Sequence, residues 1–452
     1  MSEQGSKAAG SAHELALPRF ADPGKEDRSA HGIPVVPEFD GYRAFAIFGI
    51  LFTHLILASA VIGGVGENRA DELMAGIGPW LISILFVVSG FVVFLPTVAR
   101  GGEFGKVGGY AIRRAARLLP AFWVAMTIVL ILIALQPGRG FPGWDTIVVT
   151  YAGQDTWATF FEPRFAQGFG IDGPIWSLTL EIGFYIVLPF IAAAYCRRPL
   201  IGLAIAAAIS IGWRVGFANL EDLLGVFGIH INPGRAGQLQ FASYAQLPSW
   251  AFAFGAGMTS AWAYVYLPRR FGREAVARFA RPALAASILV LAVCAYFSSH
   301  HADGRNVISA ALSAQRDIPL FFGYVGAIAA AMLALSLSRL PSPFRSTPAR
   351  RLGDLSYGVY LIHAPIIWAL VRWTDISHDG SLRALLVFVA IVVPASVTYG
   401  YLSARFVEQP IRRWARRFGR RAQDPAPGTP EAPQPSGPRL AREPSAAAQS
   451  DA

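Results

Sequence analysis

Uncharged apolar runs long enough to cross a membrane recur along the chain, and they limit its fold more than any other feature. Three of them cover residues 44–66, 77–99 and 118–136. A helix needs about 20 apolar residues to cross the hydrocarbon core of a bilayer, and each run is about that long. Only 15% of the residues are charged, against about 25% in an average soluble domain. The sequence therefore predicts an all-α polytopic membrane protein.

The apolar segments number about ten, and the helices that they form must share one bundle. The 452 residues are therefore expected to hold one transmembrane domain, over residues 38–418, rather than several soluble domains. Residues 1–37 and 419–452 are polar or rich in Pro, Ala and Ser, and we expect both to be disordered cytoplasmic segments. No cleavable signal peptide is expected. The apolar segments are expected at residues 42–64, 77–99, 118–136, 174–195, 199–218, 246–267, 282–298, 318–338, 352–371 and 384–405.

Lysine and arginine gather in alternate connections between these segments. Cytoplasmic loops attract both residue types, so the alternation predicts that the two termini lie in the cytoplasm, N-in and C-in. Topology then explains the net charge of +10, and no nucleic-acid partner is expected. Cys196 and Cys294 lack the spacing of a disulfide framework or a metal site, and no metal is expected. The basic connections are residues 100–117, 197–198, 269–281, 339–351 and 412–421.

Three ionisable side chains lie in or beside the first segment: Asp40, Arg43 and His54. Arg43 and His54 are eleven positions apart, which is three helical turns plus about 20°, so both lie on one face about 16 Å apart along the axis. Ionisable groups at membrane depth are costly and usually face a polar cavity, which favours a functional site. The alternative is structural: His54 bonds a neighbouring carbonyl and Arg43 extends to the lipid headgroups.

Two further charged features border or enter the segments. Arg114 and Arg117, at i and i+3, project from one helical face and form a paired fork that suits phosphate groups, unless they are only positive anchors of topology. Glu181 lies within the fourth segment, close to Trp176 and Tyr185. A carboxylate at membrane depth needs a partner, and Glu181 either orients a catalytic histidine or pairs with an arginine.

The remaining polar residues of the segments are expected to support packing and hydrogen bonding. Ser89, beside Gly90, lets two helices approach closely. Tyr360 and His363 share one helical face, and we expect His363 to be a structural residue rather than a second base. Glu408 meets an arginine-rich surface, where an ion pair is the simple interpretation.

Six short motifs, in order along the chain, resemble those of the acyltransferase-3 family of integral membrane O-acyltransferases. Each motif is weak alone, but together they extend over most of the predicted transmembrane domain. The matching residues are Asp40, Gly41, Arg43 and His54; Phe86, Ser89, Gly90 and Phe91; Arg114 and Arg117; Trp176, Ser177, Leu178 and Glu181; Ser356, Tyr357, Tyr360, Leu361 and His363; and Phe406, Glu408 and Pro410.

The resemblance implies transfer of an acetyl or other short acyl group from cytoplasmic acyl-CoA to a hydroxyl of a cell-envelope carbohydrate or glycolipid. It implies a multi-pass enzyme of the bacterial inner membrane, with no bound cofactor and with acetyl-CoA as the expected donor. Many relatives also carry a fused soluble hydrolase-like domain of the SGNH type. Such a domain is not expected here.

The residues fit this chemistry physically. Arg43, Arg114 and Arg117 are expected to bind the phosphates of CoA, a polyanion that cannot enter hydrocarbon. His54 is expected to accept the proton of the attacking hydroxyl, because neutral imidazole is a base near pH 7. Glu181 or Asp40 is expected to support it. The expected structural or supporting residues are Ser89, Trp176, Tyr185, Tyr360, His363 and Glu408.

Two alternatives to an envelope acyltransferase stay open. The first is a tailoring acyltransferase that modifies a glycosylated small metabolite such as a macrolide. The second, from a different class, is a transporter or flippase in which His54 and Glu181 relay protons. Transporters often contain internal repeats, and no motif is duplicated in this sequence, so the enzyme is favoured. The sequence predicts no oligomeric state.

Overall fold

A computed structural model describes residues 34–60, 69–138, 140–162, 165, 173–300, 318–374, 376 and 380–420. These ranges contain helices, turns and loops but no strand, which confirms the predicted all-α class. Most of the two terminal segments predicted to be disordered, 1–37 and 419–452, lies outside the described residues.

Within the described ranges, ten helices have 20 or more residues, and each matches one predicted segment. Nine of them are long and apolar enough to span a membrane, α11 being the exception. The ten helices are α2 (Glu38–Ser59), α3 (Arg69–Ala99), α4 (Val107–Leu135), α7 (Trp176–Arg197), α8 (Pro199–Ala218), α11 (Leu247–Phe271), α12 (Arg273–His300), α14 (Ile318–Leu337), α15 (Thr347–Trp373) and α16 (Leu382–Ser403).

Helix α11 lies at the centre of the bundle and packs directly against α3. A Cβ atom placed on Gly90 would lie 2.2 Å from the carbonyl oxygen of Phe254, and one on Gly257 would lie 2.2 Å from that of Val87. The two backbones therefore touch, which only glycine allows at these positions. The small and polar residues that permit this contact also lower the mean hydropathy of α11. The helix tolerates them because it faces protein rather than lipid.

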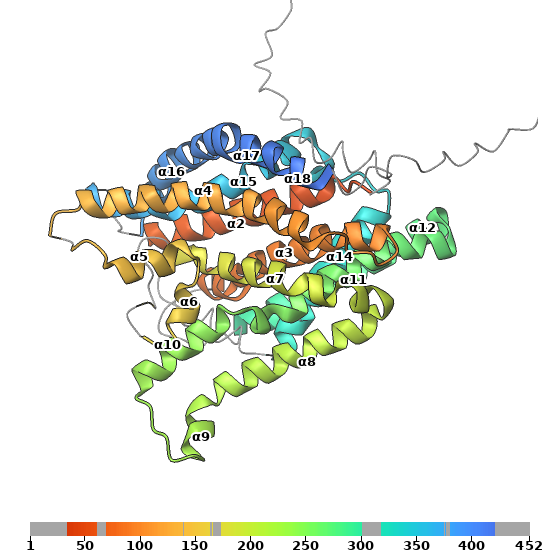
Figure 1. Cartoon of the computed structure of the whole chain (residues 1–452), viewed down its shortest axis with the longest axis horizontal. Helices are drawn as coiled ribbons and strands as arrows, with labels where there is room; N and C mark the ends of the chain where they lie inside the picture. The colour runs from red at the N-terminus through yellow and green to blue at the C-terminus, as the bar shows by residue number, and fades with distance from the viewer. Residues whose placement is uncertain are drawn as a thin grey trace, which may run out of the picture.

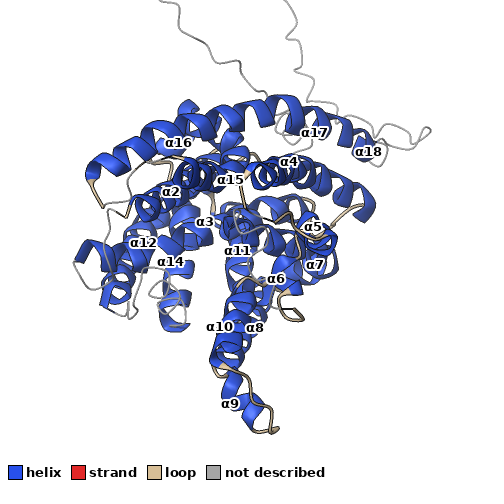
Figure 2. Cartoon of the chain, turned by 90° about the vertical axis from the view of Figure 1, so that its left-hand side faces the viewer, coloured by secondary structure: helices blue, strands red, loops and turns tan. Residues whose placement is uncertain are grey.

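The long helices run along the long axis of the molecule, and short helices join them at both ends (Figure 1). Seen end-on, α2, α3, α11 and α15 are central, while α16 lies on one side and α8 with α10 on the other (Figure 2). The short helices are α5 (Trp144–Tyr151), α6 (Asp155–Ala158), η2 (Gly173–Ile175), α9 (Leu220–Gly225), α10 (Pro233–Tyr244), η3 (Pro343–Arg345), the π-helical turn η4 (Ala404–Glu408), α17 (Gln409–Ala415) and α18 (Arg417–Arg420).

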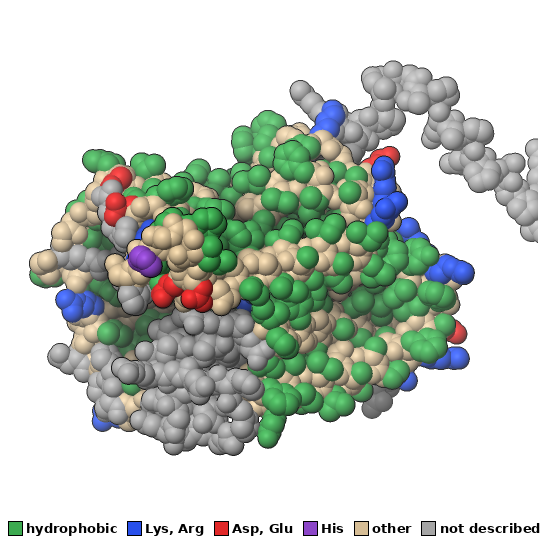
Figure 3. Space-filling view, turned by 90° about the horizontal axis from the view of Figure 1, so that it is seen from below, with side chains coloured by type: hydrophobic (Ala, Val, Ile, Leu, Met, Phe, Trp, Pro, Cys, Tyr) green, Lys and Arg blue, Asp and Glu red, His purple; other side chains and the backbone are tan. Residues whose placement is uncertain are grey.

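Basic side chains gather at one end of the bundle. Figure 3 shows them along its right-hand edge, beyond a surface that is largely hydrophobic. We call this the arginine-rich end, where α2, α4, α8, α12 and α15 begin and where α18 lies (Figure 1). The separation agrees with the alternation of charge between the predicted segments. That this end faces the cytoplasm stays a prediction.

The apolar runs predict where the membrane helices lie more accurately than they predict the residues at which those helices begin and end. Helix α4 begins at Val107 rather than at 118, and α12 begins at Arg273 rather than at 282. The reason is that arginine and alanine form helix readily outside hydrocarbon, so a helix continues beyond its apolar part. Arg114 and Arg117 consequently lie inside α4 rather than before it.

Candidate active site

Three arginines from α2 and α4 gather around a carboxylate of α7. Arg43 interacts electrostatically with both Glu181 and Arg117, and its side chain is 19% exposed. The guanidinium of Arg114 lies 5.3 Å from the ring centroid of Tyr185, within the range of a cation–π contact. Arg117 also interacts electrostatically with Tyr185. We call these five residues the arginine–glutamate cluster.

Glu181 is held by neighbours in its own helix and in α3. The hydroxyl of Tyr185 donates a hydrogen bond to its Oε1, and Ser89 Oγ donates to the same oxygen at 3.2 Å. Two hydroxyl donors and nearby arginines offset the cost of a carboxylate at this depth. Of the two partners that the sequence left open, an arginine or a histidine, the geometry favours Arg43.

Neither carboxylate expected to support His54 contacts it within the described part of the chain. Glu181 is bonded as above, and Asp40 pairs with Arg43 at 3.8 Å, one turn earlier in α2. Asp40 and His54 are fourteen positions apart in one helix, too far for a direct bond. The structure therefore places both carboxylates with the arginines.

Tyr357 of α15 joins the arginine–glutamate cluster, although the sequence marks it only as part of a motif. Its hydroxyl donates to the carbonyl of Leu118 in α4 at 2.9 Å, and it interacts electrostatically with Glu181 and Arg117. A tyrosine on the same face as other polar residues of a membrane helix is the signal that could have identified it.

Glu408 forms the ion pair expected from the sequence. Its partner is Arg412, one turn later, at 2.5 Å, and Ser403 Oγ donates to it at 3.2 Å. Arg117 also interacts with it electrostatically. Because Glu408 is only 2% exposed, these contacts supply the partners that a buried carboxylate requires.

His54 of α2 is hydrogen-bonded to His363 of α15. The distance between His54 Nδ1 and His363 Nε2 is 2.9 Å, and His363 Nδ1 lies 2.7 Å from the carbonyl oxygen of Tyr360. His54 is half-buried, whereas His363 is buried. The sequence correctly predicts that His363 forms hydrogen bonds, but it does not predict the partner, because the two histidines are 309 positions apart.

Tyr360 connects this histidine pair to the start of α7. Its hydroxyl donates to the carbonyl of Pro174 and therefore accepts from Ser177 Oγ, 2.7 Å away. Trp176, which directly precedes Ser177 in the chain, packs against Tyr244, with ring centroids 5.3 Å apart. Trp176, Tyr360 and His363 thus lie in one connected region.

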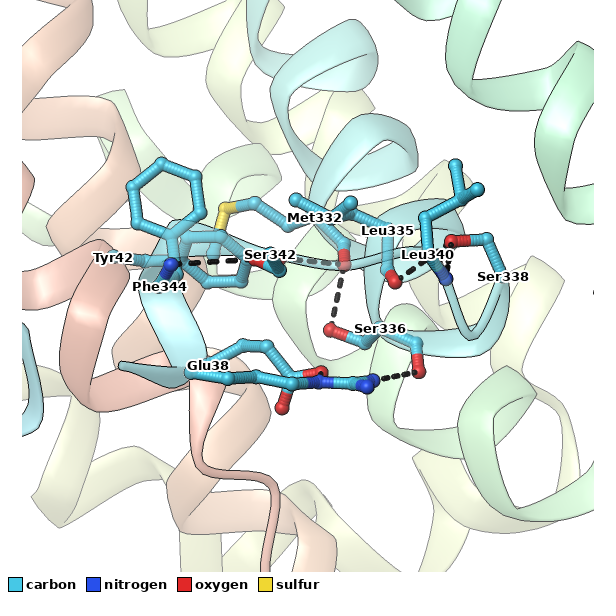
Figure 4. Close-up of polar contacts among 10 residues, drawn as sticks. Glu38, Tyr42, Met332, Leu335, Ser336, Ser338, Leu340, Ser342 and Phe344 are labelled. Carbon is cyan, nitrogen blue, oxygen red and sulfur yellow. Dashed lines mark hydrogen bonds and ion pairs between the residues drawn. The ribbon is translucent and has the colours of Figure 1, made fainter. Parts of the chain in front are cut away.

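An ion pair of a buried glutamate fixes the start of α2. Glu38, 1% exposed, pairs with Arg345 of η3, and Tyr42 donates to the carbonyl of Met332 at 3.3 Å. Figure 4 shows Glu38 and Tyr42 facing the loop between α14 and α15. Arg345 also donates to the carbonyl of Ser336 at 3.4 Å. These contacts, which the sequence does not predict, limit rotation of the helix that carries the arginine and the histidine of the site.

The arrangement combines two chemical capacities along one face of α2. The arginine–glutamate cluster presents guanidinium groups that bind anions, and the histidine pair supplies an imidazole that accepts a proton. About three helical turns separate them. Among the described residues, no group of three or more His, Cys, Asp or Glu side chains gathers in a way that would hold a metal ion.

Comparison with known proteins agrees with the motifs. A family model described as an acyltransferase domain matches residues 36–401. Peptidoglycan O-acetyltransferase OatA of Listeria monocytogenes is 27% identical over 398 residues, which cover 84% of this chain and 56% of that protein. Acyltransferase MdmB of Streptomyces mycarofaciens is 24% identical over 424 residues, covering 88% of this chain and 97% of that protein.

A third relative, nodulation protein 10 of Rhizobium leguminosarum bv. viciae, is 24% identical over 411 residues, covering 86% of this chain and 96% of that protein. The chain thus matches two relatives along nearly their whole length and only about half of OatA. No solved structure matches it. Since the family model covers most of the chain and five of its six motifs in full, the chain belongs to the acyltransferase-3 family of integral membrane O-acyltransferases.

Proposed function

We propose that this enzyme transfers a short acyl group, acetyl in the expected case, from acyl-CoA to a hydroxyl of a cell-envelope carbohydrate or glycolipid. The single observation that carries the proposal is the placement of the arginine–glutamate cluster and His54 along one face of α2. This reaction needs a site that binds a polyanionic donor, and it needs a base that accepts a proton.

The donor is assigned to the arginine-rich end. CoA carries several phosphate charges, and Arg43, Arg114 and Arg117 together present more positive charge than Glu181 neutralises. Arginine binds phosphate through two parallel hydrogen bonds, and such charge-assisted bonds are the strong ones. The phosphates stay at this end, and the thioester extends along α2 toward the histidine pair.

His54 acts as the general base. It takes the proton from the acceptor hydroxyl as the hydroxyl oxygen attacks the thioester carbonyl. A carbon–oxygen bond forms, the carbon–sulfur bond breaks, and the CoA thiolate then receives the proton from His54. Holding donor and acceptor together in one bundle also accelerates the reaction, because the two reactants no longer have to meet by diffusion.

The acceptor is assigned to the cell envelope because OatA, one of the relatives, is named a peptidoglycan O-acetyltransferase. A glycosylated small metabolite is the second candidate. It stays open because acyltransferase MdmB, matched along nearly its whole length, has a name that specifies no acceptor. In either case the enzyme resides in the bacterial inner membrane with the arginine-rich end in the cytoplasm, where acyl-CoA is present.

The proposal is tested by mass spectrometry of envelope glycans, glycolipids and secreted metabolites from cells with and without the gene. Loss of an acyl ester from one glycan or glycolipid, restored by the gene, is expected. Loss of an ester from a secreted metabolite alone identifies the second candidate. Unchanged acylation together with no consumption of acetyl-CoA by the purified protein would contradict both.

A further inference from the structure

We propose that His363 is the positioning residue of the site: it holds His54 in the tautomer that carries its proton on Nδ1 and leaves Nε2 unprotonated. Nε2 of His54 is then the atom that accepts the hydroxyl proton. The inference rests on the proposed function for the role of His54 as base. It changes the part assigned to His363, which the sequence treats as structural.

The tautomer follows from the two hydrogen bonds of His363. A carbonyl oxygen only accepts, so the 2.7 Å contact with the Tyr360 carbonyl requires a proton on His363 Nδ1. A neutral imidazole has one N–H, which leaves His363 Nε2 as an acceptor. The 2.9 Å contact with His54 therefore requires the proton on His54 Nδ1, and its Nε2 keeps a free lone pair.

The geometry of the rings supports a directed hydrogen bond. The planes of the two imidazoles differ by 3°, and their centroids are 5.1 Å apart. Since the centroids are farther apart than the bonded nitrogens by about one ring width, the rings meet edge to edge rather than face to face. The N–H of His54 then points along the lone pair of His363, the geometry in which a hydrogen bond is strongest.

His363 is itself held firmly enough to act in this way. It is 1% exposed, and the hydroxyl of Tyr360, its backbone partner, bonds both Ser177 and the carbonyl of Pro174. A ring fixed on both nitrogens has one orientation, and it imposes that orientation on His54. In Ser-His-Asp enzymes an aspartate fixes the tautomer of the catalytic histidine, and here a neutral imidazole takes that position.

During the reaction the hydrogen bond between the histidines becomes stronger. When Nε2 of His54 takes the hydroxyl proton, the ring becomes a cation, and its Nδ1–H donates a charge-assisted hydrogen bond to His363. His363 thus stabilises the protonated intermediate without a buried carboxylate beside His54.

A purely structural role for His363 is the competing explanation. Contacts elsewhere already hold α2 against α15: a Cβ atom placed on Gly353 would lie 2.3 Å from the carbonyl oxygen of Asp40. The two helices therefore stay packed when the histidine bond is removed, and the two roles can be separated by experiment.

The test compares His363→Gln with His363→Asn. Glutamine extends far enough for its amide oxygen to accept from His54 Nδ1, whereas asparagine has the same chemistry but is one methylene shorter. We expect kcat to fall on the order of 10²-fold or more in the asparagine variant, since loss of the correct tautomer costs about 10⁴ in a serine protease. The kcat of the glutamine variant should be at least tenfold higher than that of the asparagine variant. The KM for acetyl-CoA and the thermal unfolding midpoint should match in the two variants.

A second readout does not depend on activity. With ¹⁵N-labelled histidine, and with His54→Asn to assign the signals, solid-state NMR should show His54 protonated at Nδ1 in the unmodified protein. In His363→Asn it should show a mixture of tautomers. His54 protonated at Nε2 in the unmodified protein would overturn the inference, as would equal kcat values for the two variants. If the NMR result holds but the purified protein transfers no acyl group, the proposed function fails and the positioning role survives.

Discussion

His54 of α2 and His363 of α15 share a hydrogen bond of 2.9 Å between Nδ1 and Nε2. The same helix, α2, carries Arg43, which interacts with Glu181 and Arg117 about three turns away. One helix therefore links the arginine–glutamate cluster to the histidine pair. The contacts of Glu38 and Tyr42 near its start hold it in place (Figure 4).

Replacing Arg114 and Arg117 together by alanine should weaken donor binding. Each charge-assisted hydrogen bond to phosphate is worth about 1.5–3 kcal/mol, so the Kd for acetyl-CoA should rise tenfold or more. Acceptor affinity should change little. Isothermal titration with acetyl-CoA and an acceptor-dependence curve measure the two effects.

Arg113→Ala is the matched control, because this arginine lies in the same turn of α4 but its side chain is exposed, whereas those of Arg114 and Arg117 are half-buried. Donor binding should be nearly normal in it. An equal loss in Arg113→Ala would mean that only the total positive charge matters. No loss in the double variant, provided that it folds, would leave Arg114 and Arg117 as topology anchors.

Glu181→Gln should have little effect on catalysis. Glutamine keeps an oxygen that accepts from Ser89 and Tyr185, and loss of the negative charge leaves the neighbouring arginines more attractive to phosphate. We therefore expect a lower KM for acetyl-CoA and a decrease in kcat of less than about tenfold, well below the 10²–10⁴ expected for a general base. Steady-state kinetics with purified protein decide this. A 10²-fold decrease in kcat would assign Glu181 a direct part in the proton transfer.

Topology is tested by cysteine labelling in intact cells, with Cys196 and Cys294 first replaced by serine. A single cysteine at Lys106 or Glu274, both exposed at the arginine-rich end, should be shielded from an impermeant thiol reagent. A single cysteine at Trp144 or Glu221, exposed at the opposite end, should react. The reverse pattern would place the arginine–glutamate cluster outside the cell and exclude cytoplasmic acyl-CoA as its ligand.

The sequence predicts the helices of this fold well because a bilayer allows few alternatives. Helix α11 is predicted from the length of its uncharged run, although its small residues give it a lower mean hydropathy than the nine other long helices have. The helix ends are less predictable. The start of α4 lies among basic residues that form helix as readily as the apolar run does.

Within the site, relationships inside one helix are predictable and those between helices are not. The placement of Arg43 and His54 on one face follows from helical periodicity alone. The bond between His54 and His363 depends on how α2 and α15 are rotated against each other. Backbone contacts such as that of Gly353 with Asp40 set this rotation, and the sequence gives no measure of them.

The most direct measurement is the rate of acetyl transfer by purified His54→Ala protein, with His230→Ala, an exposed histidine in the loop between α9 and α10, as the control. Removal of a general base costs about 10²–10⁴ in rate, so kcat should fall by that factor, while acetyl-CoA binding and thermal stability stay close to those of the unmodified protein. His230→Ala should transfer acetyl normally. Transfer by His54→Ala at the rate of the unmodified protein would contradict the role of His54 as the base and would place the proton acceptor elsewhere.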